Sequence, residues 1–383
     1  MDRRTFTGLA AASLISAPAL VSAQSARHVT IVGAGAAGLT AAYHLARAGI
    51  QIEVLEASQT WGGRMKRLSG FADVPLDLGA EWVHDDPEIF GRMLGFGETD
   101  LGVETIIYQP QTYQFWNNGK LNDFNMLRHG YQEVKFRDTT WYGFFERFVL
   151  PFVREHLFFG AAVAQISKSG SKLEVRLSSG QTVETDVILV TVPLSVLQRE
   201  QISFLDGLAP SRMSALQNID FGAGFKAFLK FDTRFYPDML FEGPRTTAFA
   251  DTWAEKVYYD AAFGKPTRQN ILGLFTVSDA PLPRAALDDA ALLNDILSEL
   301  TAMFGPVVGE TYLGGVVQNW SRERFIMGSY SMENESDYEA TEILAPVEGR
   351  VFFAGEVLGE EDGSTVQGAA FSAQRAVAQI LAR

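Results

Sequence analysis

The sequence predicts an α/β fold that begins with a dinucleotide-binding unit. Residues 28–56 have the pattern of a strand, a glycine-rich turn, a helix and a second strand, and residues 187–193 form an apolar run typical of a buried parallel strand. The 383-residue chain is 47% hydrophobic and 20% charged, which supplies a large core and excludes a disordered chain. Its length predicts one large domain or two interleaved ones.

The charge balance and the lack of cysteine exclude several classes of function. The chain carries 46 acidic and 32 basic residues and a formal charge of −14, so we expect no nucleic-acid partner. An acidic protein is compatible with a cationic small-molecule substrate. With no cysteine in the chain, disulfides, thiolate catalysis, cysteine-ligated metals and thioether-linked cofactors are excluded.

Residues 1–26 predict an export signal. Arg3 and Arg4 precede Phe6, and an apolar run at residues 9–21 is followed by a small-x-small pattern at residues 21–23. The run is short for a membrane span, and the paired arginines are typical of a twin-arginine signal. An ordinary secretory signal or a membrane anchor is the alternative. We therefore expect a periplasmic or secreted protein with no stable membrane insertion after cleavage.

The turn after the first strand has the spacing of a phosphate-binding loop. Gly33 allows the tight turn, Gly35 lets backbone N–H groups approach a pyrophosphate, and Gly38 lets the helix and strand pack closely. The N-terminus of the following helix attracts the phosphates. Glu56 closes the second strand, 18 residues after Gly38, and can accept both ribose hydroxyls. These features predict a Rossmann-type domain.

A second glycine motif follows the first and carries a family resemblance. Gly62-Gly63-Arg64 begins six residues after Glu56, and Asp77-Leu-Gly79-Ala80-Glu81-Trp82-Val-His84 comes next. Adjacent glycines and an arginine give a second place where backbone and guanidinium groups can meet phosphate or flavin. Here the sequence resembles the flavin amine oxidases, which comprise monoamine oxidases, polyamine oxidases and flavin histone demethylases. The Trp-Val-His ending is most similar to polyamine and spermine oxidases.

The resemblance extends over nearly the whole chain beyond residue 26 and implies its organisation. An FAD-binding domain with the GxGxxG and glycine-pair motifs is interleaved with a substrate domain of mixed sheet and helices, which is trimmed between about residues 90 and 160. Thr60 stands where the family usually has an arginine, so a looser phosphate grip is expected. The expected FAD-binding segments are 27–88, 160–206 and 345–383, and the expected substrate-domain segments are 89–159 and 207–344.

Lys226 is the leading candidate for a catalytic residue. It lies in the apolar stretch 221–231, where a buried ammonium would be costly without a polar site beyond it. The resemblance implies that Lys226 bonds through a water to flavin N5. A lysine that reaches solvent from an edge strand is the alternative, and we expect Lys230 to be of that kind.

Four further residues match the family's substrate site. Trp320 and Tyr330, ten residues apart, match the flavin-facing tryptophan and the first tyrosine of the family's aromatic cage, although both could be core aromatics. Thr365 takes the place of the second cage wall, which resembles the demethylase branch and implies a less aromatic pocket. His84 matches a histidine beside the flavin that could accept the substrate's ammonium proton, and a structural role is equally consistent.

The resemblance also implies how FAD is held. Val163 would lie against the adenine, Glu356 would bond the ribityl chain, and the helix that opens near Thr365 would point its N-terminus at the flavin. Because the chain has no cysteine, the cysteinyl link of mitochondrial monoamine oxidases is impossible and FAD should be non-covalent. The implied cofactor-binding residues are Gly33, Gly35, Ala36, Ala37, Gly38, Glu56, Ala57, Gly62, Gly63, Arg64, Gly79, Ala80, Glu81, Trp82, Val163, Trp320, Gly355, Glu356, Thr365 and Val366.

The predicted function is that of an FAD-dependent amine oxidase. A primary or secondary amine, with polyamines among the candidates, would lose a hydride to flavin N5 and give an imine or aldehyde. Oxygen or another acceptor would then reoxidise the flavin. An L-amino-acid oxidase is an alternative that needs a cation for the carboxylate, for which Arg92, Arg128 and Arg137 are available. A non-catalytic flavoprotein that binds or assembles with a partner is the other.

Overall fold

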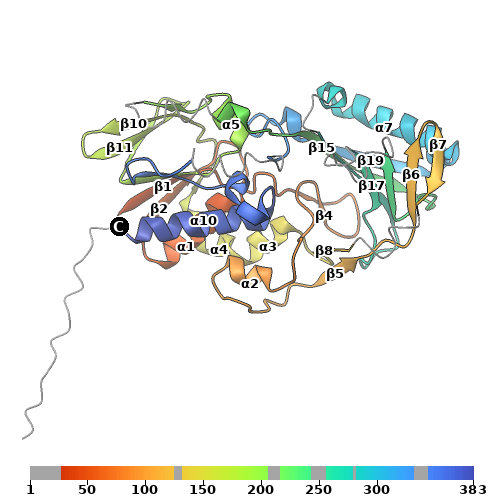
Figure 1. Ribbon diagram of the computed structural model, residues 1–383, viewed down its shortest axis with the longest axis horizontal. Coiled ribbons are helices and arrows are strands. Elements are labelled where there is room, and N and C mark those ends of the chain that lie inside the picture. The colour runs from red at the N-terminus through yellow and green to blue at the C-terminus, as the bar shows by residue number, and fades with distance from the viewer. Residues whose placement is uncertain (1–26, 125–131, 206–215, 243–255, 279–281, 332–343) are drawn as a thin grey trace, which may run out of the picture.

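The computed structural model describes residues 27–124, 132–205, 216–242, 256–278, 282–331 and 344–383. These ranges form two lobes, one around a parallel sheet and the other around a larger mixed sheet (Figure 1). The expected export signal and Arg128 lie outside the described residues. Within those ranges, no helix combines the length and the apolar character needed to cross a bilayer.

The first lobe is built on a five-stranded parallel sheet in the order β20-β13-β1-β2-β9. Its strands come from the beginning, middle and end of the chain, so the polypeptide leaves this lobe and returns to it. The strands are apolar along most of their length because both faces of the sheet are covered. Their bounds are β1 His28–Val32, β2 Gln51–Leu55, β9 Leu157–Phe158, β13 Val187–Val190 and β20 Val351–Phe353.

Helices cover one face of this sheet. α1 (Ala36–Arg47) follows β1 directly, and α10 (Val366–Leu381) packs beside it (Figure 1). The two helices approach closely because alanines line their contact, with Ala41 and Ala370 fully buried. The same core takes in three further helices: α2 (Ile89–Met93), α3 (Trp141–Phe148) and α4 (Leu150–Val153).

A four-stranded sheet covers the opposite face. Ser179-Gly180 lies in the turn between β11 and β12, which pair antiparallel as a hairpin. The strands run in the order β12-β11-β10-β14, and their apolar side packs on the parallel sheet in one core. Their bounds are β10 Val163–Ser169, β11 Lys172–Leu177, β12 Thr182–Thr185 and β14 Ser203–Phe204, with helix α5 at Leu194–Gln198.

The second lobe is a seven-stranded mixed sheet in the order β19-β15-β18-β17-β16-β6-β7. Helix α7 (Asp289–Phe304) covers one face, and the Asp288 carboxylate caps it by accepting from the Ala291 N–H at 2.8 Å. The opposite face contributes to the large cavity described below. The strands are β6 Tyr113–Asn117, β7 Lys120–Asp123, β15 Ala223–Phe231, β16 Met239–Glu242, β17 Lys256–Asp260, β18 Asn270–Ser278 and β19 Tyr312–Asn319.

Residues 89–159, expected as the first part of the substrate domain, contribute to both lobes. Helices α2, α3 and α4 pack in the helical layer of the first lobe, β9 joins its sheet, and β6 and β7 extend the mixed sheet. The predicted fold, a Rossmann-type α/β domain interleaved with a mixed-sheet domain, is confirmed. The remaining elements are β3 Arg67–Leu68, β4 Leu76–Asp77, β5 Thr105–Tyr108, β8 Glu133–Phe136, α8 Val307–Thr311, and the short 3-10 turns η2 Arg154–His156, η3 Leu216–Asn218, η4 Pro283–Ala286, η5 Trp320–Arg322, η6 Glu356–Leu358 and η7 Glu360–Asp362.

Candidate active site

One cavity of about 2640 Å³ is lined from both lobes. Every residue that the sequence analysis expected at the site lines it, with the exception of Gly38. The lining includes the turn between β1 and α1, the second glycine motif, the 79–84 loop, the start of β10, the mixed sheet and the start of α10. Segments more than 300 residues apart in sequence therefore meet around one space.

The two glycine motifs touch through their backbones. The Gly62 N–H donates to the Ala34 carbonyl at 2.8 Å, and a Cβ on Gly63 would stand 3.2 Å from Gly35 Cα. Gly38 lies behind the cavity, where a Cβ would come within 1.9 Å of the Gly33 carbonyl oxygen. A Cβ on Gly35 meets nothing within 4 Å, so this position faces open space. The motifs thus form a bare backbone surface of the kind that cradles phosphates.

Glu56 is fixed at the end of β2. Its carboxylate accepts from the Ala34 N–H at 2.7 Å and from the Ser58 N–H at 2.8 Å, and the residue is 8% exposed. The carboxylate is therefore held against the cavity wall next to the first glycine motif. This is the place at which a ribose of a dinucleotide would meet it.

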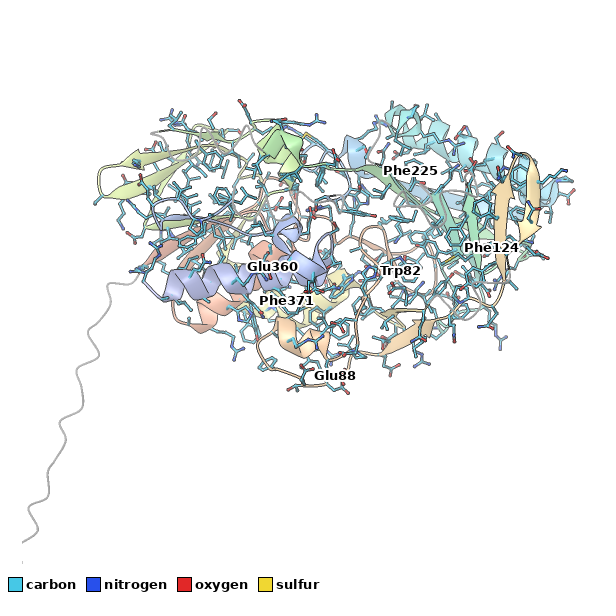
Figure 2. All side chains as sticks on the ribbon, in the orientation of Figure 1. Trp82, Glu88, Phe124, Phe225, Glu360 and Phe371 are labelled. Atoms are coloured by element: carbon cyan, nitrogen blue, oxygen red, sulfur yellow. The ribbon has the colours of Figure 1, made fainter. Side chains whose placement is uncertain are left out.

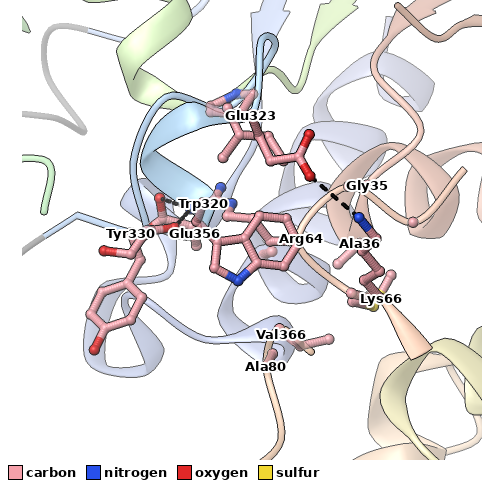
Figure 3. A pocket seen from close by; sticks show the side chains of 18 of the residues that line it. Gly35, Ala36, Arg64, Lys66, Ala80, Trp320, Glu323, Tyr330, Glu356 and Val366 are labelled. Atoms are coloured by element: carbon pink, nitrogen blue, oxygen red, sulfur yellow. Dashed lines mark hydrogen bonds and ion pairs between the residues drawn. The ribbon is translucent and has the colours of Figure 1, made fainter. Parts of the chain in front are cut away.

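Arg64 joins the second glycine motif to the last third of the chain. Its guanidinium donates to Glu356 at 3.0 Å and to the Ser329 carbonyl at 2.8 Å (Figure 3). Glu356 also accepts from the Ser331 hydroxyl at 2.5 Å. Both charged groups are thus oriented before any ligand binds, at a point where they line the cavity.

Trp320 is held at the junction of the lobes. Its indole N–H donates to the Leu78 carbonyl at 3.0 Å, and the residue is 6% exposed. Gly79 packs so closely that a Cβ there would lie 3.1 Å from the indole and 1.7 Å from the Arg64 carbonyl oxygen. The Lys66 ammonium lies 5.9 Å from the centre of the indole and is paired with Glu323 (Figure 3).

Lys226 is buried and faces the cavity from β15. Its ammonium donates to Glu81 at 2.6 Å and to the Gly79 carbonyl at 3.1 Å. An ammonium has three N–H groups, so one remains for a group in the cavity that Lys226 lines. Lys230, four residues on, donates to the Phe71 carbonyl at 2.9 Å and does not line the cavity.

Glu81 also contacts Tyr259 and a second lysine, Lys135. Its carboxylate also accepts from the Tyr259 hydroxyl at 2.5 Å and lies 2.8 Å from the ammonium of Lys135. Burial alone would raise the pKa of Glu81, but the two ammonium groups outweigh burial and lower that pKa. Neither Lys135 nor Tyr259 belongs to a recognisable motif, so neither could be identified from the sequence.

The side chain that faces Tyr330 is Phe275, and not Thr365, which was expected as the second wall of the cage. Its ring is nearly parallel to that of Phe275, at 15° with centroids 6.5 Å apart, and both line the cavity. Phe275 pairs with Lys226 across β15 and β18. Thr365 also lines the cavity, but its hydroxyl caps α10, accepting from the Gly368 N–H at 3.0 Å and donating to the Asp362 carbonyl at 2.6 Å. Phe275 was not foreseen from the sequence.

His84 lies on the wall of the cavity in a strained backbone conformation. Its φ is 58°, and its side chain is 42% exposed. The imidazole Nδ1 is 3.0 Å from a carboxylate oxygen of Glu133, another lining residue.

Near the glycine pair, the rings of Trp61 and Tyr142 are stacked, with centroids 3.8 Å apart and an interplanar angle of 19°. This stack is next to Thr60 in the chain, and both rings also line the cavity.

The fold and the cavity define a dinucleotide-binding protein, and the comparisons with known proteins identify it as an oxidoreductase of a particular family. Residues 151–381 match the family described as flavin containing amine oxidoreductase, and residues 31–95 match a Rossmann-like NAD(P)-binding domain. The chain therefore belongs to the flavin containing amine oxidoreductases, as the resemblance predicted. Membership of this family implies a flavin cofactor.

Individual relatives are distant. The chain is 25% identical to lysine-specific histone demethylase 2 of Homo sapiens over 93% of its own length, and spans about half (53%) of that protein. It is 24% identical to polyamine oxidase 7 of Oryza sativa subsp. japonica, covering 95% of this chain and 97% of that one. The solved structure of cyclohexylamine oxidase from Brevibacterium oxydans IH-35A is similar with a TM-score of 0.76 at 16% identity, covering 93% and 100% of the two chains.

Two glycine variants distinguish the effect of the phosphate loop on folding stability from its effect on FAD binding. We expect Gly35→Ala to fold as the unaltered protein does, because its methyl group points into open space, yet to bind FAD about 10–100-fold more weakly, equivalent to about 1–3 kcal/mol. Gly38→Ala should lower the unfolding free energy of the apoprotein by about 1–3 kcal/mol or more, because its methyl group meets the Gly33 carbonyl. Denaturant melts and FAD titrations measure both. Equal FAD affinity in Gly35→Ala would contradict the phosphate assignment.

Proposed function

We propose that the protein is an FAD-dependent amine oxidase acting on a primary or secondary amine, with polyamines among the candidate substrates. The observation that carries the proposal is Lys226, a buried lysine whose two hydrogen-bond acceptors leave one N–H over and which lines a cavity together with Tyr330 and Phe275. Non-covalent FAD, when bound, would supply the redox chemistry, which is uptake of a hydride from the amine carbon and delivery of the two electrons to oxygen, giving hydrogen peroxide.

The chain's own residues suit FAD along the cavity. The bare backbone at the glycine motifs suits the pyrophosphate, Glu56 the ribose and Val163 the adenine. The paired Arg64 and Glu356 suit the ribityl chain, and the N-terminus of α10, at Val366, offers unpaired N–H groups to the flavin.

Lys226 would hold a water next to flavin N5. Its contacts with Glu81 and Gly79 fix the direction of its third N–H, so no reorganisation is needed when the reaction proceeds. Once the substrate carbon has lost its hydride, the resulting imine would react with water to give an aldehyde and either ammonia, from a primary amine, or a smaller primary amine, from a secondary one.

His84 would take the proton from the substrate's ammonium group. Because Nδ1 faces the carboxylate of Glu133 it carries the hydrogen, which leaves Nε2 as the acceptor. Glu133, with Glu361 and Asp362 on the same cavity, gives the lining an acidic character that attracts a cationic amine. The Tyr330–Phe275 pair offers apolar walls for its carbon chain.

Two of the arginines considered for an amino-acid oxidase lie away from the cavity. Arg92 is engaged by Asp85 at 2.5 Å, Arg137 is paired with Glu104, and neither lines the cavity. The carboxylate of an amino-acid substrate would therefore meet neither of these cations.

The proposal also includes export: the arginine pair and apolar run in residues 1–26 support a periplasmic or secreted protein that folds around FAD before it leaves the cytoplasm.

Anaerobic mixing of the purified protein with polyamines, simple amines and amino acids tests the function directly. Bleaching of the flavin absorption by one or more amines, and not by amino acids, is the expected result. Because bleaching reports reduction itself, it does not depend on the electron acceptor. Bleaching by amino acids alone would replace the proposal with an amino-acid oxidase, and no bleaching by any of them would favour a non-catalytic flavoprotein.

Denaturation of the purified protein should release all its flavin as FAD. The chain has no cysteine, so the known thioether link cannot form. Acid or heat precipitation followed by chromatography of the supernatant measures the release. Flavin that stays with the precipitate would show a covalent bond to another residue.

Lys226→Met should retain FAD but turn over roughly 10²–10³-fold more slowly, since it loses the donor aimed at the cavity. Glu81 keeps Lys135 and Tyr259 as partners, so we expect the unfolding free energy to fall by only about 1–2 kcal/mol. Stopped-flow reduction and reoxidation measure the two half-reactions.

Lys230→Met is the matched control for Lys226→Met. It removes the same charge from the same face of β15, away from the cavity, and should leave both half-reactions within about twofold of the unaltered protein. Unaltered rates in Lys226→Met, or equal losses in the two variants, would remove Lys226 from the active site.

A further inference from the structure

Lys135 is a fully buried ammonium enclosed by aromatic rings. It lies on β8 with 0% of its surface exposed, and its Nζ is 2.8 Å from Glu81. Three rings surround the charge: the Nζ lies 4.8 Å from the centre of Trp82, 5.0 Å from Tyr108 and 5.3 Å from Tyr259. Trp82, labelled in Figure 2, lies between the two lobes.

The negative charge of Glu81 is already compensated without Lys135. Lys226 already neutralises its charge at 2.6 Å, and the Tyr259 hydroxyl supplies a further hydrogen bond. Two ammonium groups and one carboxylate leave a net charge of +1, buried beside the cavity. Burying an ammonium without full compensation costs several kcal/mol, which a methionine at the same position would avoid. The stability of the fold therefore does not account for the presence of Lys135.

The other ionisable groups that face this cluster do not cancel the excess charge. Burial, together with the charge of Glu81, raises the pKa of Asp77 well above its ordinary value, which favours the uncharged acid. Burial and Lys135 lower the pKa of Lys265 to about 8, so it remains largely cationic at neutral pH. Burial and Glu81 raise the pKa of Tyr259, which stays neutral, and Asp260 is paired with Arg234 at 2.8 Å.

We propose that Lys135 is a positioning residue that acts through Glu81: it orients the carboxylate that holds Lys226 and leaves an unbalanced positive charge beside the cavity where the flavin gains electrons. The inference rests on the proposed function in one respect, namely that the flavin's reactive end faces Lys226. Lys135 itself does not line the cavity, so it reaches the cofactor through Glu81 and through its field.

The consequence is a measurable shift in the flavin's reduction potential. A buried charge is screened little by salt, so its field favours added electrons at the flavin. Lys135→Met keeps the apolar stem among the aromatic rings and reduces the net charge of the cluster from +1 to 0. We expect the equilibrium between oxidised and reduced flavin to move toward the oxidised form by about tenfold, or about 30 mV for a two-electron couple.

The double variant Lys135→Met/Glu81→Gln restores the net charge. It removes one positive and one negative charge and leaves Lys226 cationic, so the potential should return most of the way to that of the unaltered protein. Lys256→Met is the matched control. Lys256 lies on β17, is paired with Glu242 of β16 and Glu299 of α7, and does not line the cavity, so its loss should leave the potential unchanged.

Potentials are measured on the FAD-loaded proteins with a chemical reductant and reference dyes, without any amine. An unchanged potential in Lys135→Met, or a double variant no closer to the unaltered protein than the single one, would overturn the inference and leave Lys135 a packing residue. If Lys135→Met fails to bind FAD, a double variant with a strongly lowered potential would overturn it as well. Failure of all amines to reduce the flavin would contradict only the proposed function.

Discussion

The carboxylate of Glu81 lies between two buried lysines, and much of the site depends on it. Through Lys226 it is bound to β15, through Tyr259 to β17 and through Lys135 to β8, while its own loop carries the Gly79 carbonyl that also binds Lys226. Because an unpaired charge in this interior would be strongly destabilising, these contacts fix the loop against the mixed sheet. The same loop packs on Trp320 through Gly79 and carries Trp82 and His84, so the constraint on Glu81 sets the wall of the cavity.

At the other end of the cavity the glycine motifs provide exposed backbone instead of charged side chains. There the chain must present bare backbone, and it does so where Gly35 and Gly63 meet, while Gly38 packs on Gly33 behind the cavity. One end of the cavity is thus suited to phosphate through N–H groups, and the other to redox chemistry through buried charge. Arg64 links the two ends by its contacts with Glu356 and Ser329.

Local patterns predicted the parts of the molecule that are local in origin. The strand, turn and helix of residues 28–47 follow from glycine spacing and apolar periodicity, and the hairpin of β11 and β12 follows from Ser179-Gly180. The family membership and fold could be predicted because two motifs occur in order at the right spacing. The roles given to the individual site residues, to non-covalent FAD and to the export signal stay predictions.

Residues brought in by long-range pairing could not be found in this way. Tyr259 is 178 residues from Glu81, the register of β15 and β18 places Phe275 opposite Lys226, and Lys135 lies in a short strand without any motif. Only tertiary structure makes these neighbours. Thr365 did carry a local signal, because threonine is a typical N-cap residue at the start of a helix. In the structure its hydroxyl accepts from the Gly368 N–H and so is used for capping.

The most direct test of this account is a crystal structure of the FAD-bound protein that resolves ordered water. We expect a water within about 3 Å of both Lys226 Nζ and flavin N5, with Glu81 still bound to Lys226, Lys135 and Tyr259. A flavin whose N5 lies away from Lys226, or a Glu81 that leaves both lysines to bind the cofactor, would contradict it.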